Sequence, residues 1–150
     1  MLPGLFASFL LLAACVVIHA IGLALLLRWA YARPPSVSRH PWKLTIFIVH
    51  IAWWLTFLHL IQIVLWALYY VSKGCLPDFE TALYFSGVSY STLGYGDVVL
   101  PHEWRMLGPT EGLTGILMCG LSTAIFFGIA HRLLEARAKG RIGDIDHPFK

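Results

Sequence analysis

Seven consecutive residues in the second half of the chain, Ser91-Thr92-Leu93-Gly94-Tyr95-Gly96-Asp97, suit neither a helix nor a strand. Residues with a side chain avoid positive φ whereas glycine accepts it, so alternating Gly94 and Gly96 with larger residues lets successive carbonyl groups point to one side. A row of carbonyl oxygens is a ligand set for a dehydrated cation, because hard cations prefer oxygen and a carbonyl carries only partial charge. These residues therefore indicate the binding and ready release of a hard cation.

Other polar side chains in the apolar stretches do not combine into a second kind of site. His50 and His59 are nine residues apart, about 900° on a helix and so on opposite faces, which prevents them from jointly holding a haem or a metal ion. His59 and Gln62 share a face and are expected to hydrogen-bond to a neighbouring helix rather than to carry protons. His19 is interpreted as a satisfied or snorkelling histidine, with a proton-sensitive group as the alternative. A redox or haem enzyme is thus the weakest hypothesis.

The composition around these residues is that of a membrane protein. Of the 150 residues, 58% are hydrophobic and only 13% are charged, and the mean hydropathy is +0.71. Residues 5–27, 44–72 and 112–131 contain no formal charge, and each stretch is long enough to cross a hydrocarbon core of about 30 Å. We therefore predict an all-α integral membrane protein with three transmembrane helices.

The distribution of basic residues predicts the orientation in the membrane. Arg28, Arg33, Arg39 and Lys43 lie around the first connection, and further basic residues follow the third stretch. Because basic loops stay cytoplasmic, the N-terminus and residues 73–111 are expected outside, and the C-terminus inside. The predicted location is the plasma membrane, which in a bacterium is the inner membrane.

A short helix is predicted immediately before the seven-residue stretch. Asp78 is a good N-cap and Glu80 suits the first turn, so the helix should span residues 79–90. At about 12 residues it is too short to cross the membrane and must dip in and return. Non-helical backbone at that depth is tolerated only where it is buried in protein or lines water, which indicates a re-entrant pore helix and loop.

The stretch Thr92-Leu93-Gly94-Tyr95-Gly96-Asp97 resembles the selectivity-filter signature of potassium channels. With the flanking apolar helices, the chain resembles a small prokaryotic-type potassium channel of the pore-loop superfamily, built on a two-transmembrane pore unit. The resemblance covers roughly residues 44–133 and implies K⁺ as the bound ion, with Thr92, Leu93, Gly94, Tyr95 and Gly96 as ion-binding residues. Leu93 departs from the family, which mostly has Val or Ile there. Its carbonyl is retained, but a side chain without β-branching is expected to stiffen the filter less.

The resemblance also suggests which residues support the filter. Tyr84 and Phe85 hold the places of an aromatic pair that should pack behind Tyr95. Val88 stands where some members carry a glutamate that pairs with the filter aspartate, so Asp97 needs another partner. Our hypothesis is that the Tyr84 hydroxyl supplies it.

The third apolar stretch is predicted to form the pore-lining inner helix, residues 110–136, with Thr110 as its cap and Glu111 in its first turn. Gly112, Gly115, Gly120 and Gly128 make it thin, which suits either close packing or bending. Gly120 matches the family's inner-helix hinge, and Ser122 and Thr123 are expected to offer hydroxyls to a water-filled cavity. Before this helix, residues 102–105 should form a turn.

The remaining segments complete the predicted domain organisation. Residues 1–32 form an extra transmembrane helix without an arginine repeat, expected on the lipid-facing side of the second. A signal peptide is disfavoured there because no basic residue precedes the long apolar run. Residues 33–43 are expected to form a proline-containing cytoplasmic linker. Residues 44–136 are expected to form the pore domain, with the outer helix at 44–71 and the filter at 92–96. Residues 137–150 are expected to form a short tail, which cannot hold a soluble regulatory domain.

One filter strand cannot surround an ion, so four copies must close as a cyclic homotetramer in the lipid bilayer. The leading functional hypothesis is a passive, potassium-selective channel, not an enzyme and without a nucleic-acid partner. The alternatives are a non-selective cation channel and a non-conducting membrane interaction or sensor subunit. An intact filter argues against the last, because a scaffold has no need of glycines with positive φ.

Overall fold

The computed structural model describes residues 2–32 and 41–146, with side chains described for residues 4–32 and 42–136. These ranges form the α-helices α1 (Leu2–Ala32), α2 (Pro41–Ser72), α3 (Phe79–Tyr90) and α4 (Leu107–Asp146), with a short 3-10 helix, η1 (His102–Trp104), ahead of α4. No strand occurs within the described ranges, so the prediction of an all-α protein is confirmed.

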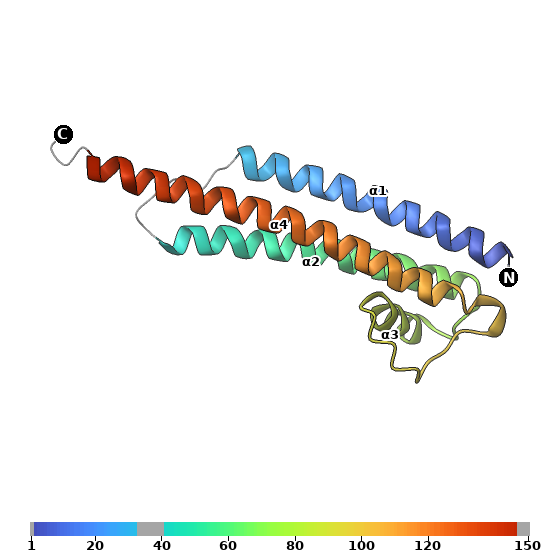
Figure 1. Cartoon of the computed structure of the whole chain (residues 1–150). Helices are drawn as coiled ribbons and strands as arrows, with labels where there is room; N and C mark the ends of the chain where they lie inside the picture. The colour runs from blue at the N-terminus through green and yellow to red at the C-terminus, as the bar shows by residue number, and fades with distance from the viewer. Residues whose placement is uncertain (1, 33–40, 147–150) are drawn as a thin grey trace.

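The long helices α1, α2 and α4 run side by side, and the shorter α3 lies at one end of this bundle (Figure 1). Each long helix contributes a segment that is long and apolar enough to cross a membrane: Gly4–Ala32, Trp42–Ser72, and His102–Ala136, which also includes η1. The prediction of three membrane-spanning helices is therefore confirmed by length and composition. The start of α1 lies at the same end as α3 and its following loop, whereas α4 ends at the opposite side (Figure 1).

The short helices match the predicted ranges, and the long ones differ at their ends. α3 has the bounds expected from Asp78, and η1 occupies the predicted turn. α2 begins three residues before the predicted outer helix, since Pro41 is tolerated at a helix start, and ends one residue after it. Of the predicted linker, residues 33–40 lie outside the described residues.

The inner helix was predicted as 110–136, and both ends prove wrong. α4 begins at Leu107, because Pro109 then falls in the first turn, where its missing N–H removes no helical hydrogen bond. Thr110 does not cap the helix; its hydroxyl donates to the Met106 carbonyl at 2.9 Å. The helix also continues to Asp146, so most of the predicted tail is helical. Arg137, Ala138, Lys139 and Arg141 favour helix in this part, although it also contains two glycines.

α1 packs against both α2 and α4, which corrects the expectation that it lies only on the outer side of the second helix. The Trp54 indole on α2 donates to the Gly22 carbonyl of α1 at 3.1 Å. On the other side, Arg132 of α4 donates to the Tyr31 hydroxyl at 2.7 Å. The extra helix is thus an integral part of the bundle.

The interior contains two apolar clusters separated by a polar layer. One cluster, around Trp66, Tyr70 and Phe85, joins α2 and α3 near the loop end of the bundle. The other joins α1 and α2 toward the opposite end through Leu26 and Ile51. Along α1 and α2, the buried side chains of His19 and Gln62 lie between the two clusters. Buried polar groups at this depth need partners within the protein.

Candidate functional site

The position of α3 is set by a strong N-cap. Asp78 has extended backbone geometry, and its carboxylate accepts from the Thr81 backbone N–H at 2.8 Å and from the Thr81 hydroxyl at 2.9 Å. These hydrogen bonds, the backbone one first, lower the pKa of Asp78 below its ordinary value. Because the cap fixes where the helix starts, it also fixes which residues leave its far end after Tyr90.

The backbone after α3 alternates in handedness. φ is +64° at Thr92, +59° at Gly94 and +78° at Gly96, whereas Leu93 and Tyr95 between them lie outside the positive-φ region. Sequence reasoning predicted positive φ only at the two glycines. The third left-handed residue, Thr92, is unusual because β-branched side chains rarely adopt that region.

The N–H groups at the start of this segment turn back to the end of α3. Those of Leu93 and Gly94 both donate to the Val88 carbonyl, at 3.0 and 3.3 Å, and that of Thr92 donates to the Ser89 carbonyl at 3.0 Å. Among the described residues, no hydrogen bond ends on a carbonyl oxygen of residues 92–96. The segment therefore has its early donors used and its acceptors free, which is the chemistry required for binding cations.

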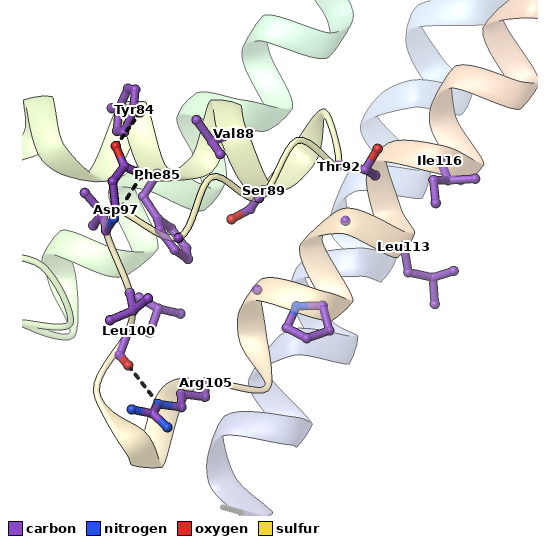
Figure 2. Close-up of a pocket in the computed structure, with 17 residues that line it drawn as sticks. Tyr84, Phe85, Val88, Ser89, Thr92, Asp97, Leu100, Arg105, Leu113 and Ile116 are labelled. Carbon is purple, nitrogen blue, oxygen red and sulfur yellow. Dashed lines mark hydrogen bonds between the residues drawn. The ribbon is translucent and has the colours of Figure 1, made fainter.

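The segment lies on the exposed side of α3. Leu93 is 59% exposed and Tyr95 68% exposed, and a Cβ at Gly94 or Gly96 would meet nothing within 4 Å. A groove of about 810 Å³ runs between the segment, α3 and the start of α4. Figure 2 shows Thr92 beside α4, near Ile116. Within one chain, the candidate ion-binding residues thus face outward from the core.

The predicted partner of Asp97 is confirmed. The Tyr84 hydroxyl donates to Asp97 Oδ2 at 2.6 Å, as the dashed line in Figure 2 shows, and the Val98 N–H donates to Oδ1 at 3.0 Å. The Tyr84 hydrogen bond holds the pKa of Asp97 below its ordinary value and raises the pKa of Tyr84. Val88, one turn further along α3, has no polar side-chain atom to contribute.

The predicted aromatic pair behind Tyr95 is not formed within the chain. Phe85 is buried and contacts Tyr70 edge to face, with ring centroids 5.2 Å apart at 85°. Tyr84 is directed to Asp97 instead. Neighbouring residues on a helix point about 100° apart, so Phe85 lies in the core whereas Tyr84 lies near residues 92–97.

Glu111 is a functional candidate that sequence reasoning missed. It is fully buried on α4, its Oε2 accepts from the Tyr70 hydroxyl at 2.6 Å, and its Oε1 contacts the Ser86 hydroxyl. Ser86 on α3 also lies 2.8 Å from the Ile63 carbonyl of α2. The carboxyl group thus connects three helices directly behind α3. The signal was present in the sequence, because a charged residue inside a membrane span is rare and usually has a specific partner.

Ser122 was expected at a water-filled cavity, and its position contradicts this. It is 6% exposed, and its hydroxyl lies 3.1 Å from Nε2 of both His19 and His59. Thr123 is exposed and donates to its own helix at Cys119, so of the two residues only Thr123 remains a cavity candidate. His50 is exposed and bonds the Ile46 carbonyl at 2.8 Å, away from the inward-facing His59, as their spacing predicted.

The glycines of α4 separate into two groups. A Cβ on Gly115 would lie 1.9 Å from the Tyr90 carbonyl oxygen, and one on Gly112 would lie 3.2 Å from that of Ser89, so these two glycines allow α4 to touch the end of α3. At Gly120 and Gly128 nothing lies within 4 Å. Packing therefore explains the first pair, and Gly120 stays a prediction as a hinge within a continuous helix.

Two comparisons with known proteins bear on this geometry. The sequence profile of a family described as "Ion channel" matches residues 44–131. The TWiK family of potassium channels protein 18 of Caenorhabditis elegans is 34% identical over 73 residues, which is 48% of this chain. The chain spans only 15% of the length of that relative. No solved structure matches significantly.

Proposed function

Because this chain belongs to the ion channel family of two-transmembrane pore units, with one extra helix ahead of the unit, we propose that it conducts K⁺ selectively and passively across a membrane. The observation that carries the proposal is the backbone of residues 92–96. Three alternating left-handed residues and free carbonyl oxygens are the features that a potassium filter requires. The channel relative supports the choice of K⁺.

In this proposal the filter replaces the water around K⁺ with protein oxygens. The carbonyls of Thr92, Leu93, Gly94 and Tyr95 and the Thr92 hydroxyl bind the ion, and Gly96 allows the chain to turn away. The C-terminal end of α3 carries partial negative charge, which favours a cation beneath the filter. The hydrogen bond from Tyr84 to Asp97 braces the outer end.

A complete filter requires four copies around one axis. We propose a cyclic homotetramer in the lipid bilayer, because a single strand of carbonyls leaves most of the coordination shell open. The exposure of Leu93 and Tyr95 in the single chain is consistent with neighbouring copies covering this face. The N-terminus and filter lie outside, and the C-terminus is cytoplasmic, in a plasma membrane.

Residues 44–136 form the pore domain of this channel. Thr123 offers its hydroxyl to the cavity below the filter, and Gly120 is the bending point of α4. Its open surroundings leave space for such bending. The first helix lies outside the minimal pore unit.

The test is ion flux through purified protein reconstituted in liposomes. K⁺ or Rb⁺ should pass far better than Na⁺, and Gly94→Ala should abolish flux with tetramer assembly preserved, since alanine is strained at φ +59°. Gly128→Ala is the matched control, because that helical glycine has open surroundings. Equal passage of Na⁺ and K⁺ would indicate a non-selective cation channel. Absence of flux, together with an unchanged cellular phenotype for Gly94→Ala, would indicate a non-conducting subunit.

A further inference from the structure

Five buried or partly buried side chains from all of α1 to α4 form a closed ring of hydrogen bonds. The Tyr90 hydroxyl donates to Gln62 Oε1 at 2.6 Å, and Gln62 Nε2 lies 2.8 Å from His19 Nδ1. His19 Nε2 lies 3.1 Å from the Ser122 hydroxyl, which lies 3.1 Å from His59 Nε2. The other imidazole nitrogen of His59, Nδ1, lies 2.9 Å from the Tyr90 hydroxyl, and this contact closes the ring of hydrogen bonds.

Counting protons around the ring determines the state of both imidazoles. Tyr90 uses its proton on Gln62, so it can only accept from His59 Nδ1–H. Gln62 donates its amide N–H to His19 Nδ1, which leaves the His19 proton on Nε2, directed to Ser122. Ser122 then donates to the bare Nε2 of His59. Every contact has one proton, and both histidines are neutral.

The two histidines therefore need opposite tautomers, with the proton on Nδ1 of His59 and on Nε2 of His19. Reversing the Gln62 amide would reverse every bond of the ring and exchange the two tautomers, which would leave them opposite. With the amide as described, a positive charge on His19 would set its Nδ1–H against the Gln62 N–H. A positive charge on His59 would make Ser122 accept from both imidazoles and leave the Ser122 proton without a partner in the ring. Either orientation of the Gln62 amide therefore predicts two neutral histidines with opposite tautomers.

The ring joins the extra helix to the base of the filter segment. Tyr90 is the last residue of α3, two positions before Thr92 with its φ of +64°. The Tyr90 backbone is also held from the other side by the close approach of α4 at Gly115. A displacement of the Tyr90 side chain would therefore be transmitted to the first ion-binding residue through two intervening peptide bonds.

From this arrangement we infer that His19 and His59 are positioning residues, which hold the Tyr90 side chain through hydrogen bonds that require neutral histidines of opposite tautomers. Through this ring, α1 helps to fix the position of the filter residues that follow Tyr90. This inference rests on the proposed function for its effect on ion flux, but the ring itself does not. Buried hydrogen-bond networks hold a unique arrangement only when every member is satisfied, as here.

The first test is solid-state NMR of the full chain, labelled with ¹⁵N-histidine and reconstituted in phospholipid bilayers with K⁺ at neutral pH. The nitrogen shifts should show His19 and His59 as neutral and of opposite tautomers, assigned by comparison with His19→Gln and His59→Gln. Identical tautomers, or a charged imidazole at either position, would overturn the inference. The result does not depend on ion conduction.

The second test breaks the ring at Ser122, which does not contact Tyr90 directly. Ser122→Ala should shift the Nε2 resonances of both histidines, which lose their hydrogen-bond partner, and lower K⁺ flux about fivefold, the effect of one net hydrogen bond. The controls are His50→Gln and Thr56→Val, which change an exposed imidazole and an exposed hydroxyl, each bonded to its own helix. Unchanged Nε2 resonances together with unchanged flux in Ser122→Ala would refute the inference.

The two proposals can fail separately. Liposomes that pass no K⁺ while NMR shows opposite tautomers would reject the channel and retain the ring. Selective K⁺ flux with identical tautomers or a charged histidine would reject the ring and retain the channel. Should Ser122→Ala fail to assemble, Tyr90→Phe in its place removes the hydroxyl that His59 Nδ1 meets while retaining the aromatic side chain, and a shift of the Nδ1 resonance of His59 is the expected readout.

Discussion

The Tyr84 hydroxyl and the Asp97 carboxylate, 13 residues apart in the sequence, are joined by a hydrogen bond of 2.6 Å. This bond connects α3 to the residue that follows residues 92–96, the proposed filter, so it ties the end of that segment to α3. Val88, on the same helix, has only an aliphatic side chain. In the proposed channel, the Tyr84 phenol takes the place of the acid that some family members carry on this helix.

Replacing Tyr84 with phenylalanine should weaken the outer filter. Tyr84→Phe retains the ring and removes the donor, which leaves Asp97 with the Val98 N–H. We expect a several-fold lower sustained K⁺ flux in liposomes, with the largest loss at low K⁺, where fewer ions hold the filter open. Tyr31→Phe, which alters a hydroxyl at the opposite end of the bundle, is the control. Equal flux in wild type and Tyr84→Phe would contradict the bracing role.

External acid should act through the same pair. The Tyr84 hydrogen bond lowers the pKa of Asp97, so the ionised carboxylate stabilises the folded outer filter at every pH above its ordinary pKa. This contribution is lost as the pH falls through the lowered value. In Tyr84→Phe the pKa of Asp97 returns toward its ordinary value, so the loss should occur at a higher pH. Flux measured against external pH should therefore fall earlier in the variant, and coincident profiles would exclude this coupling.

A methyl group at Gly115 should destabilise the contact between α4 and α3. The added Cβ would lie 1.9 Å from the Tyr90 carbonyl oxygen, and backbone cannot move aside as a flexible side chain can. We expect Gly115→Ala to lower the free energy of unfolding by about 1–3 kcal/mol, the usual range for overpacking. Gly128→Ala should be neutral or slightly stabilising, because alanine is the better helix former. Thermal unfolding of the detergent-solubilised protein would distinguish them, and equal midpoints would argue against the contact.

Glutamine should replace Glu111 better than alanine does. Three hydrogen bonds link Tyr70 to Glu111, Glu111 to Ser86, and Ser86 to the Ile63 carbonyl. Each bond needs one proton, and the two hydroxyl groups of Tyr70 and Ser86 supply only two. A neutral carboxylic acid completes the set, and the glutamine amide can imitate it. Glu111→Gln should therefore stay close to wild type in stability. Glu111→Ala should lose about 1–3 kcal/mol for each buried group left without a partner.

The same unfolding measurement decides between the two protonation states of Glu111. If Glu111→Gln is as damaging as Glu111→Ala, the carboxyl group is ionised in the folded protein. Thr56→Val, an exposed change on α2, controls for the general effect of substitution within a span.

The features that the sequence determined by itself arise from local causes. The bounds of α3 followed from the Asp78 cap and from a length too short to cross a membrane. The positive φ of Gly94 and Gly96 followed from the conformational freedom of glycine alone. The spans followed from uncharged length, and the shared face of His59 and Gln62 from helical spacing. Each of these depends on a few neighbouring residues.

Only the tertiary structure decided which partner each face meets. Helical spacing places residues on a common face, but the spans are apolar all round, so no polar side marks the surface that points inward. For this reason Ser122 was assigned to a cavity although it meets two histidines, and α1 was assigned to one neighbour although it contacts two. Glu111 and Thr92 likewise take their states from α2 and α3, because a buried carboxyl and a left-handed β-branched residue persist only where surrounding contacts hold them.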